Sequence, residues 1–176
     1  MPFRDDDIGD LNEPDEGMPE PPEELEKRPD RGDVRTREVK VMGVFLEGGD
    51  EEGMPPNYFV LLRDSRDRRL PILVGPFEAR AIAEAVQGGE RLTPRPMTHD
   101  LLKTTIERLG AKIDHLTIDD LWQEVYYAKL SLIVGDNVVD VDTRPSDGIA
   151  VALRAGAPIY VAESVLEEGE KPREPE

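Results

Sequence analysis

Acidic and guanidinium side chains gather at the expected starts of two similar helices, and they are the clearest candidates for chemistry. Pro76–Gly88 and Pro145–Gly156 each open with proline, carry a carboxylate soon after it, run through Ile-Ala-x-Ala and end on glycine. Proline suits the first helical turn, an acid there faces the positive end of the helix dipole, and glycine ends a helix in a left-handed conformation. The charged residues at the two starts are Glu78, Arg80, Arg144 and Asp147.

These residue types are suited to binding and cleaving a phosphodiester. Carboxylates are the ligands that Mg²⁺ or Mn²⁺ prefers, and such a metal neutralises a phosphate and activates water. Asp140 and Asp142 lie two apart on an expected strand, and therefore on one face of it. Guanidinium groups pair bidentately with phosphate oxygens. The candidates are His99, Asp100 and Asp147 as catalytic residues, Arg80 and Arg144 as phosphate-binding residues, and Glu78, Asp140 and Asp142 as metal ligands.

Each candidate also has a purely structural interpretation. The acids at helix starts can serve as caps or as partners of the helix dipole. Asp140 and Asp142 can form the solvent-facing side of an edge strand. Arg80 and Arg144 can form salt bridges with the neighbouring acids, and His99 can be a surface histidine. The residues alone therefore predict a charged surface at helix N-termini without selecting a reaction.

Several common site types are absent from the sequence. There is no Gly-x-x-x-x-Gly-Lys-Ser/Thr loop, and Gly75 stands alone where a dinucleotide fingerprint would need several glycines. The chain has no cysteine and only two histidines, which excludes disulfides, thiolate zinc sites and cysteine nucleophiles. We therefore expect no organic cofactor.

The acidity of the chain is concentrated near its ends. The formal net charge is −17; residues 1–33 contain 13 acids and 4 bases, and residues 167–176 contain 5 and 2. We expect acidic disordered tails over 1–33 and 167–176, flanking a domain over 34–166. No apolar run is long enough to span a membrane and the first residues do not resemble a signal peptide, so the expectation is a cytoplasmic protein that does not contact a membrane.

The pattern of the central domain predicts an α+β fold. Short turns join most of the expected strands, which favours a mainly antiparallel sheet with about three short helices. Two similar strand-helix units raise the possibility of an internal duplication. The expected strands are 34–46, 58–63, 70–74, 113–120, 125–134, 138–142 and 159–161. A third helix is expected from a Thr98 cap to Gly110, with Leu102, Ile106 and Leu109 on its apolar face.

Four segments resemble the bifunctional nuclease (BFN) domain family, which is also known as a domain of unknown function. They are Leu70–Ala83, Arg95–Leu102, Leu109–Lys112 and Thr143–Ile159. The resemblance spans about Val39 to Leu166, with the segments in the family's order. It implies the family's fold and a nuclease that acts on DNA, RNA or both.

Three hypotheses follow. The first is a metal-assisted nuclease that uses Mg²⁺ or Mn²⁺ and the candidates above, although the overall acidity disfavours nucleic acid as a partner. The second is a non-catalytic, oligomeric module that binds a ligand or a partner. The third is an ion-pair network that only fixes the fold. A homo-oligomer is expected under the first two, because exposed edge strands are commonly covered across a two-fold axis.

Overall fold

The computed structural model describes residues 34–49, 56–88 and 95–169, which belong to one unit that begins at Val34. Of the predicted tails, 1–33 and 170–176 lie outside the described residues. The predicted boundary at residue 166 falls within a helix that continues to Gly169. In the described part of the chain, no helix is long and apolar enough to cross a membrane, and the cytoplasmic location stays a prediction.

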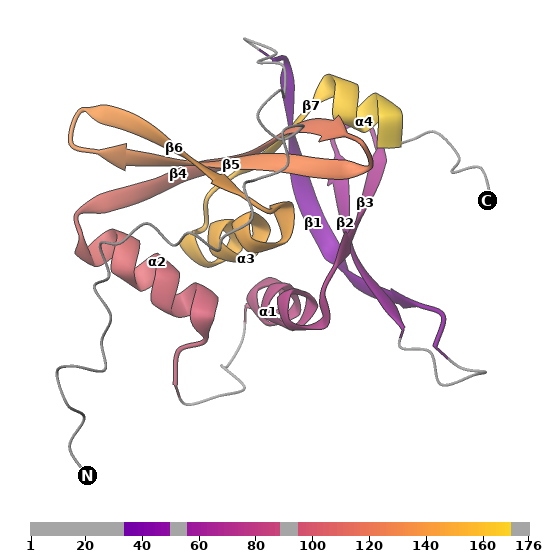
Figure 1. Ribbon diagram of the computed structural model, residues 1–176, viewed down its shortest axis with the longest axis horizontal. Coiled ribbons are helices and arrows are strands. Elements are labelled where there is room, and N and C mark those ends of the chain that lie inside the picture. The colour runs from indigo at the N-terminus through magenta and orange to yellow at the C-terminus, as the bar shows by residue number, and fades with distance from the viewer. Residues whose placement is uncertain (1–33, 50–55, 89–94, 170–176) are drawn as a thin grey trace, which may run out of the picture. The chain divides into compact units, whose positions relative to one another are not determined.

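Seven strands form one sheet in the order β3-β2-β1-β7-β4-β5-β6 (Figure 1). The strands are β1 (Thr36–Glu47), β2 (Asn57–Asp64), β3 (Arg69–Val74), β4 (Ala111–Trp122), β5 (Val125–Val134), β6 (Asn137–Thr143) and β7 (Ile159–Ala162). Antiparallel pairing joins β1–β2, β2–β3, β4–β5, β5–β6 and β1–β7, whereas β4 and β7 are parallel.

The sheet consists of two three-stranded meanders with β7 between them. The meander β1–β2–β3 leads into helix α1 (Pro76–Val86), and the meander β4–β5–β6 leads into helix α3 (Pro145–Ala155). Helix α2 (Thr98–Arg108) precedes β4, and α1, α2 and α3 lie together on one side of the sheet (Figure 1). Helix α3 packs against both α1 and α2. Its central position brings the starts of the other helices to its own N-terminus.

Small residues allow α3 to approach the sheet closely. Gly148, Ala150 and Ala152 are fully buried or nearly so, together with Ile149 and Val151. A Cβ atom on Gly148 would lie 2.4 Å from Cδ1 of Leu116 on β4. The backbone of α3 is therefore held against β4, and the residues at its N-terminus take fixed positions.

The predicted fold class, an α+β domain with a mainly antiparallel sheet and about three helices, is corrected in two respects. The sheet is mixed, because the chain returns through α3 into β7, which pairs in parallel with β4. The described residues contain four helices, since α4 (Glu163–Gly169) follows β7 and buries Val165 and Leu166. The domain is thus an α+β fold with a seven-stranded mixed sheet.

Helix α2 also differs from its prediction. Its N-cap is Met97 rather than Thr98, and none of its residues is buried. Leu102 and Leu109 of the expected apolar face are exposed, and Ile106 is only half-buried. The face of α2 that turns inward instead includes His99 and Asp100, which take part in polar contacts with α3.

Candidate active site at the N-termini of α1 and α3

The starts of α1 and α3 have the same local construction. Gly75 and Arg144 are the N-caps, both with extended backbone, and each is followed by a proline at the first helical position. A residue before proline is kept out of the helical conformation, which explains why each helix begins abruptly at this point. Because Arg144 is itself the cap residue of α3, its side chain starts at the edge of the helix and can reach across to α1.

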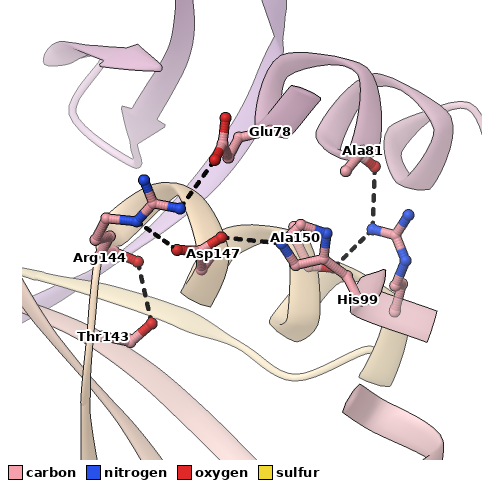
Figure 2. A network of polar contacts seen from close by, with 8 residues as sticks. Glu78, Ala81, His99, Thr143, Arg144, Asp147 and Ala150 are labelled. Carbon is pink, nitrogen blue, oxygen red and sulfur yellow. Dashed lines mark hydrogen bonds and ion pairs between the residues drawn. The ribbon is translucent and has the colours of Figure 1, made fainter. Parts of the chain in front are cut away.

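Arg144 joins the two helices through two carboxylates. Its Nε donates to Oδ2 of Asp147 at 2.6 Å, and its Nη2 donates to Oε1 of Glu78 at 2.9 Å (Figure 2). Within the described residues Nη1 has no partner, and 68% of the side chain is exposed. The two carboxylates raise the pKa of Arg144 further, Asp147 contributing more than Glu78. A permanent, oriented cation is therefore presented to solvent.

Asp147 lies between Arg144 and His99 and is bonded to both. Its second oxygen, Oδ1, lies 3.0 Å from Nε2 of His99 on α2 (Figure 2). Burial alone would raise the pKa of Asp147, but the hydrogen bonds of Arg144 and His99 outweigh it and hold that pKa below its usual value. Asp147 is thus a carboxylate at neutral pH, and it accepts a hydrogen bond from Nε2–H of His99.

Only one ring nitrogen of His99 is hydrogen-bonded within the described residues. The bond to Asp147 places a proton on Nε2, and Nδ1 has no hydrogen-bond partner among the described residues. The side chain is 11% exposed, and Nδ1 is not one of the buried atoms left without a partner. A carboxylate that fixes the imidazole tautomer in this manner is a recurring feature of proton-transfer sites.

Glu78 fits against the backbone of Gly75. A Cβ atom at position 75 would lie only 2.4 Å from Oε2 of Glu78, so the glycine makes space for this carboxylate. Oε1 is bonded to Arg144, whereas Oε2 has no hydrogen-bond partner among the described residues. The glycine before α1 therefore has a role in positioning Glu78 as well as in starting the helix.

Arg154 holds the three helices together behind the cluster. Its side chain is 8% exposed and donates to Oδ1 of Asp100, to the carbonyl oxygen of Ala81 on α1 and to that of Ala150 on α3. Asp100 also accepts from the backbone N–H of Met97. Arg154 is not among the residues predicted from the sequence, because two of its partners, Asp100 and Ala81, lie 54 and 73 residues away and no local pattern marks them.

The cluster contains four of the eight candidates from the sequence, and we call it the Arg144 cluster: Glu78, His99, Arg144 and Asp147. Asp100 is bonded to Arg154 rather than to this group. Arg80 pairs with Glu84, one turn further along α1, at 3.0 Å. Asp140 and Asp142 lie on β6. These four are not joined to the Arg144 cluster by any of the contacts described.

Asp140 belongs instead to a polar chain on the sheet. It accepts from the hydroxyl of Ser131 at 2.6 Å, and that hydroxyl oxygen lies 3.2 Å from Nε2 of His115. Nδ1 of His115 in turn lies 2.8 Å from Asp114. Ser131 is buried and already donates its proton to Asp140, so it is not arranged as a nucleophile. Asp142 is exposed and lies opposite Lys129 in the register of β5 and β6, while Lys129 forms its ion pair with Asp119.

The sequence pattern described as the bifunctional nuclease domain matches residues 60–174, a segment that contains the whole Arg144 cluster. The chain belongs to the bifunctional nuclease domain family. This confirms the resemblance found in the sequence, and it supports a nuclease-like function at the level of the family.

Relatives in two groups of organisms are similar to this chain. An uncharacterized protein of Mycobacterium tuberculosis is 45% identical over 131 residues, which cover 73% of each chain. A protein named bifunctional nuclease 2 of Oryza sativa subsp. japonica is 30% identical over 118 residues, which are 65% of this chain and 36% of the relative. Bifunctional nuclease 2 of Arabidopsis thaliana is 28% identical over 130 residues, or 71% and 39%. This chain thus spans little more than a third of either plant relative.

The residues expected from the sequence to bind a metal do not form a metal site in this bifunctional nuclease domain. Glu78, Asp140 and Asp142 do not come together, and no group of three His, Asp or Glu residues in the described part of the chain could hold a metal ion. In the Arg144 cluster, the guanidinium lies between Glu78 and Asp147, in the position that a cation bound by both would take. Both carboxylates are therefore already paired with one and the same side-chain cation.

Proposed function

We propose that the chain cleaves phosphodiester bonds of nucleic acid at the Arg144 cluster. The observation that carries the proposal is the exposed guanidinium of Arg144, fixed by Glu78 and Asp147 next to a histidine with a free ring nitrogen. Membership of the bifunctional nuclease domain family supports the same activity.

Each residue of the cluster has a role in this proposal. Arg144 binds a phosphate oxygen through Nη1, because a guanidinium donates directed, charge-assisted hydrogen bonds. His99 transfers a proton through Nδ1, since Nε2 is occupied by Asp147. Asp147 orients His99, and Glu78 and Asp147 together orient Arg144.

Phosphate binding at this cluster depends on directed donors rather than on a surrounding positive field. The cluster combines the positive Arg144 with the negative Glu78 and Asp147, and the whole chain carries a formal charge of −17. Proteins that bind nucleic acid tightly neutralise many phosphates with lysine and arginine. We therefore propose an enzyme that contacts few phosphates and binds its substrate weakly.

An arginine-to-alanine pair tests the proposal. The purified chain is incubated with end-labelled single- and double-stranded RNA and DNA, with Mg²⁺, Mn²⁺ or a chelator. We expect Arg144→Ala to lower the cleavage rate about 100-fold, as loss of one preorganised donor does in other active sites. Arg80→Ala is the matched control, because it removes the same charge from an exposed pair with Glu84 and should leave cleavage unchanged.

Equal rates in the Arg144→Ala variant and the wild-type chain, with both folded, would reject the site. Binding of oligonucleotides without cleavage would favour a non-catalytic binding module. The predicted homo-oligomer stays a proposal; it is supported by the edge strand β6, on which Val138, Val139 and Val141 are exposed.

A further inference from the structure

The meander β1–β2–β3 carries a row of three cations on its solvent side. The strand register places Arg63 of β2 directly opposite both Lys40 of β1 and Arg69 of β3. Residues directly opposite each other project from the same side of a sheet. This side faces solvent, because Leu62 and Leu70, which point the other way, are fully buried. We call Lys40, Arg63 and Arg69 the cationic row.

The charges of the cationic row are only weakly balanced. Like charges directly opposite each other destabilise a sheet, so the row costs the fold some stability. Within the described residues, its one ion-pair partner is Asp67 in the β2–β3 turn, at 3.3 Å from Arg63 and 3.8 Å from Arg69. Asp67 is 65% exposed, and exposed pairs of this kind contribute little. Lys40 has no partner in the same part of the chain. The row therefore retains donors for an anion.

A row of apolar side chains lies on the same side of the meander, four residues further along each of β2 and β3. Phe59 is directly opposite both Phe45 and Leu73. The rings of Phe45 and Phe59 are stacked, with centroids 5.8 Å apart, and Phe45 and Leu73 are 43% and 63% exposed. We call these three residues the apolar row. At about 3.3 Å per residue, it lies about 13 Å from the cationic row.

We infer that the cationic and apolar rows together bind a single-stranded segment of nucleic acid, DNA and RNA alike. The phosphates contact the cationic row, and the bases stack on the apolar row. The inference rests on the proposed function for the identity of the ligand, and it adds a binding surface whose residues are not bonded to the Arg144 cluster.

The composition of the surface favours this ligand over other occupants. Aromatic rings beside lysine and arginine are the combination with which proteins hold single strands without sequence preference, because every base has a face that can stack and every nucleotide a phosphate. A second copy of this chain would bury the cationic row, whereas the cores of interfaces between proteins are depleted of charged residues. A free inorganic anion would leave the apolar row unused.

The surface also leads toward the Arg144 cluster. Strand β3 runs from Arg69 of the cationic row past Leu73 of the apolar row to Gly75, the N-cap of α1 (Figure 1). Glu78 lies in the first turn of that helix and is bonded to Arg144. A strand held on the meander is thus close to the proposed site of cleavage. Three phosphate contacts agree with the weak substrate binding proposed above.

The dependence of binding on salt tests the cationic row. Fluorescence anisotropy measures the affinity of labelled single-stranded DNA and RNA of about 12 nucleotides. The full-length chain carries Arg144→Ala, so that the strand is not cut. We expect log K to fall with log salt with a slope of about −2, since each neutralised phosphate of a single strand contributes about −0.7. Lys40→Ala and Arg69→Ala should each reduce the slope by about 0.7. Lys112→Ala, which removes an exposed cation from β4, should leave it unchanged.

Removal of a ring tests the apolar row. Phe45→Leu keeps an apolar side chain but removes the stacking surface, so it should weaken binding of both oligonucleotides about 5-fold or more. Binding of an abasic strand of the same length should not change, because that strand has no base to stack. Phe45→Tyr is the conservative variant and should bind like the parent chain. Thermal unfolding confirms that the variants are folded.

Removal of the acid beside the row should have the opposite effect. Asp67→Asn frees Arg63 and Arg69 from their shared partner and should tighten binding of both oligonucleotides about threefold. Asparagine tolerates the left-handed backbone at this position, where φ is 68°. Asp136→Asn in the exposed β5–β6 turn is the matched control, and it should leave the affinity unchanged.

The outcomes separate this inference from the proposed nuclease function. Lack of binding by the parent chain, or an unchanged slope in both Lys40→Ala and Arg69→Ala, would overturn the inference. If Phe45→Leu changes the molar mass in light scattering and not the affinity, the surface belongs to a second copy. In either case, cleavage that depends on Arg144 would leave the nuclease function in place. Binding that follows the expected pattern in a chain that cleaves no substrate would reject the nuclease function alone.

Discussion

Two arginines in this domain each join two carboxylates, but one is exposed and the other is enclosed. Arg144 bridges Glu78 and Asp147 with 68% of its side chain exposed. Arg68 bridges Asp64 and Glu163, both at 2.7 Å, with 12% exposed. Arg37 also pairs with Glu163, so the second group links β1, the β2–β3 turn and the start of α4.

The difference shows how the same pairing serves stability in one place and chemistry in the other. An enclosed ion pair that loses one partner leaves a desolvated charge, which is costly, whereas an exposed one leaves a charge that water solvates. Loss of Arg144 would therefore cost the fold little, so its placement at the surface is better explained by chemistry than by stability. The Arg68 group has the character of a structural clasp.

The largest expected difference is in stability. Arg68→Met should lower the free energy of unfolding by about 2–3 kcal/mol, because it leaves Asp64 without its side-chain partner. This loss in the free energy of unfolding should be smaller than the loss expected on breaking a fully buried ion pair, since Asp64 lines a cavity of about 810 Å³. Arg144→Met should cost less than about 1 kcal/mol. Urea unfolding measures both, and equal losses would contradict the comparison.

The second difference is in the response to acid. Burial alone would raise the pKa of Asp64, but hydrogen bonds from Arg68 and from the backbone of Arg66 lower it below the usual range. Hydrogen bonds from Arg37 and Arg68 lower the pKa of Glu163.

A carboxylate with a lowered pKa stabilises the fold above its unfolded-state pKa, which is about 4, and this stabilisation is lost as the pH falls through the folded-state pKa. The wild-type chain should therefore lose stability from about pH 4 downward. The loss should be clearly smaller in Arg68→Met, where two such carboxylates are affected, and slightly smaller in Arg144→Met, where Asp147 is affected. Urea midpoints at pH 6 and pH 3 measure it; an unchanged pH dependence in Arg68→Met would contradict the assignment.

The smallest expected effect tests how Gly75 positions Glu78 in the Arg144 cluster. Gly75→Ala should displace Glu78 and lower the cleavage rate about 10-fold, with a stability change below about 1 kcal/mol, because the new Cβ meets Oε2 of Glu78 at the end of a movable side chain. A double-mutant cycle with Glu78→Gln measures the coupling. If Gly75→Ala lowers the rate of the Glu78→Gln variant by the same factor, Gly75 does not act through Glu78.

Local signals in the sequence found the helices that carry the site. Proline at the start and charged residues in the first turn located α1 and α3, and the left-handed backbone of Gly156 ends α3 as its glycine predicted. The resemblance to the bifunctional nuclease domain family is confirmed over residues 60–174. The sequence also named all four residues of the Arg144 cluster among its candidates.

Features that depend on distant partners could not be predicted in the same way. The parallel pairing of β7 with β4 is a property of strand order, which short turns do not reveal. Helix α4 was missed because Glu163 and the acids after Leu166 resemble the start of an acidic tail, although Glu163 is bonded to Arg68. In the sequence Asp140 is equivalent to the other acids, and its bond to Ser131 follows from the pairing of β5 with β6.

The position of β7 has a consequence for how a newly made chain reaches its native state. Because the last strand in sequence is the middle strand in space, β1 and β4 both lack a neighbour until residues 159–162 have left the ribosome. Unpaired strand edges invite pairing with other chains. A nascent or truncated polypeptide that stops before Ile159 would therefore form two separate three-stranded sheets, each with an unpaired edge strand. Such a polypeptide would be prone to aggregate and would need chaperones to remain monomeric.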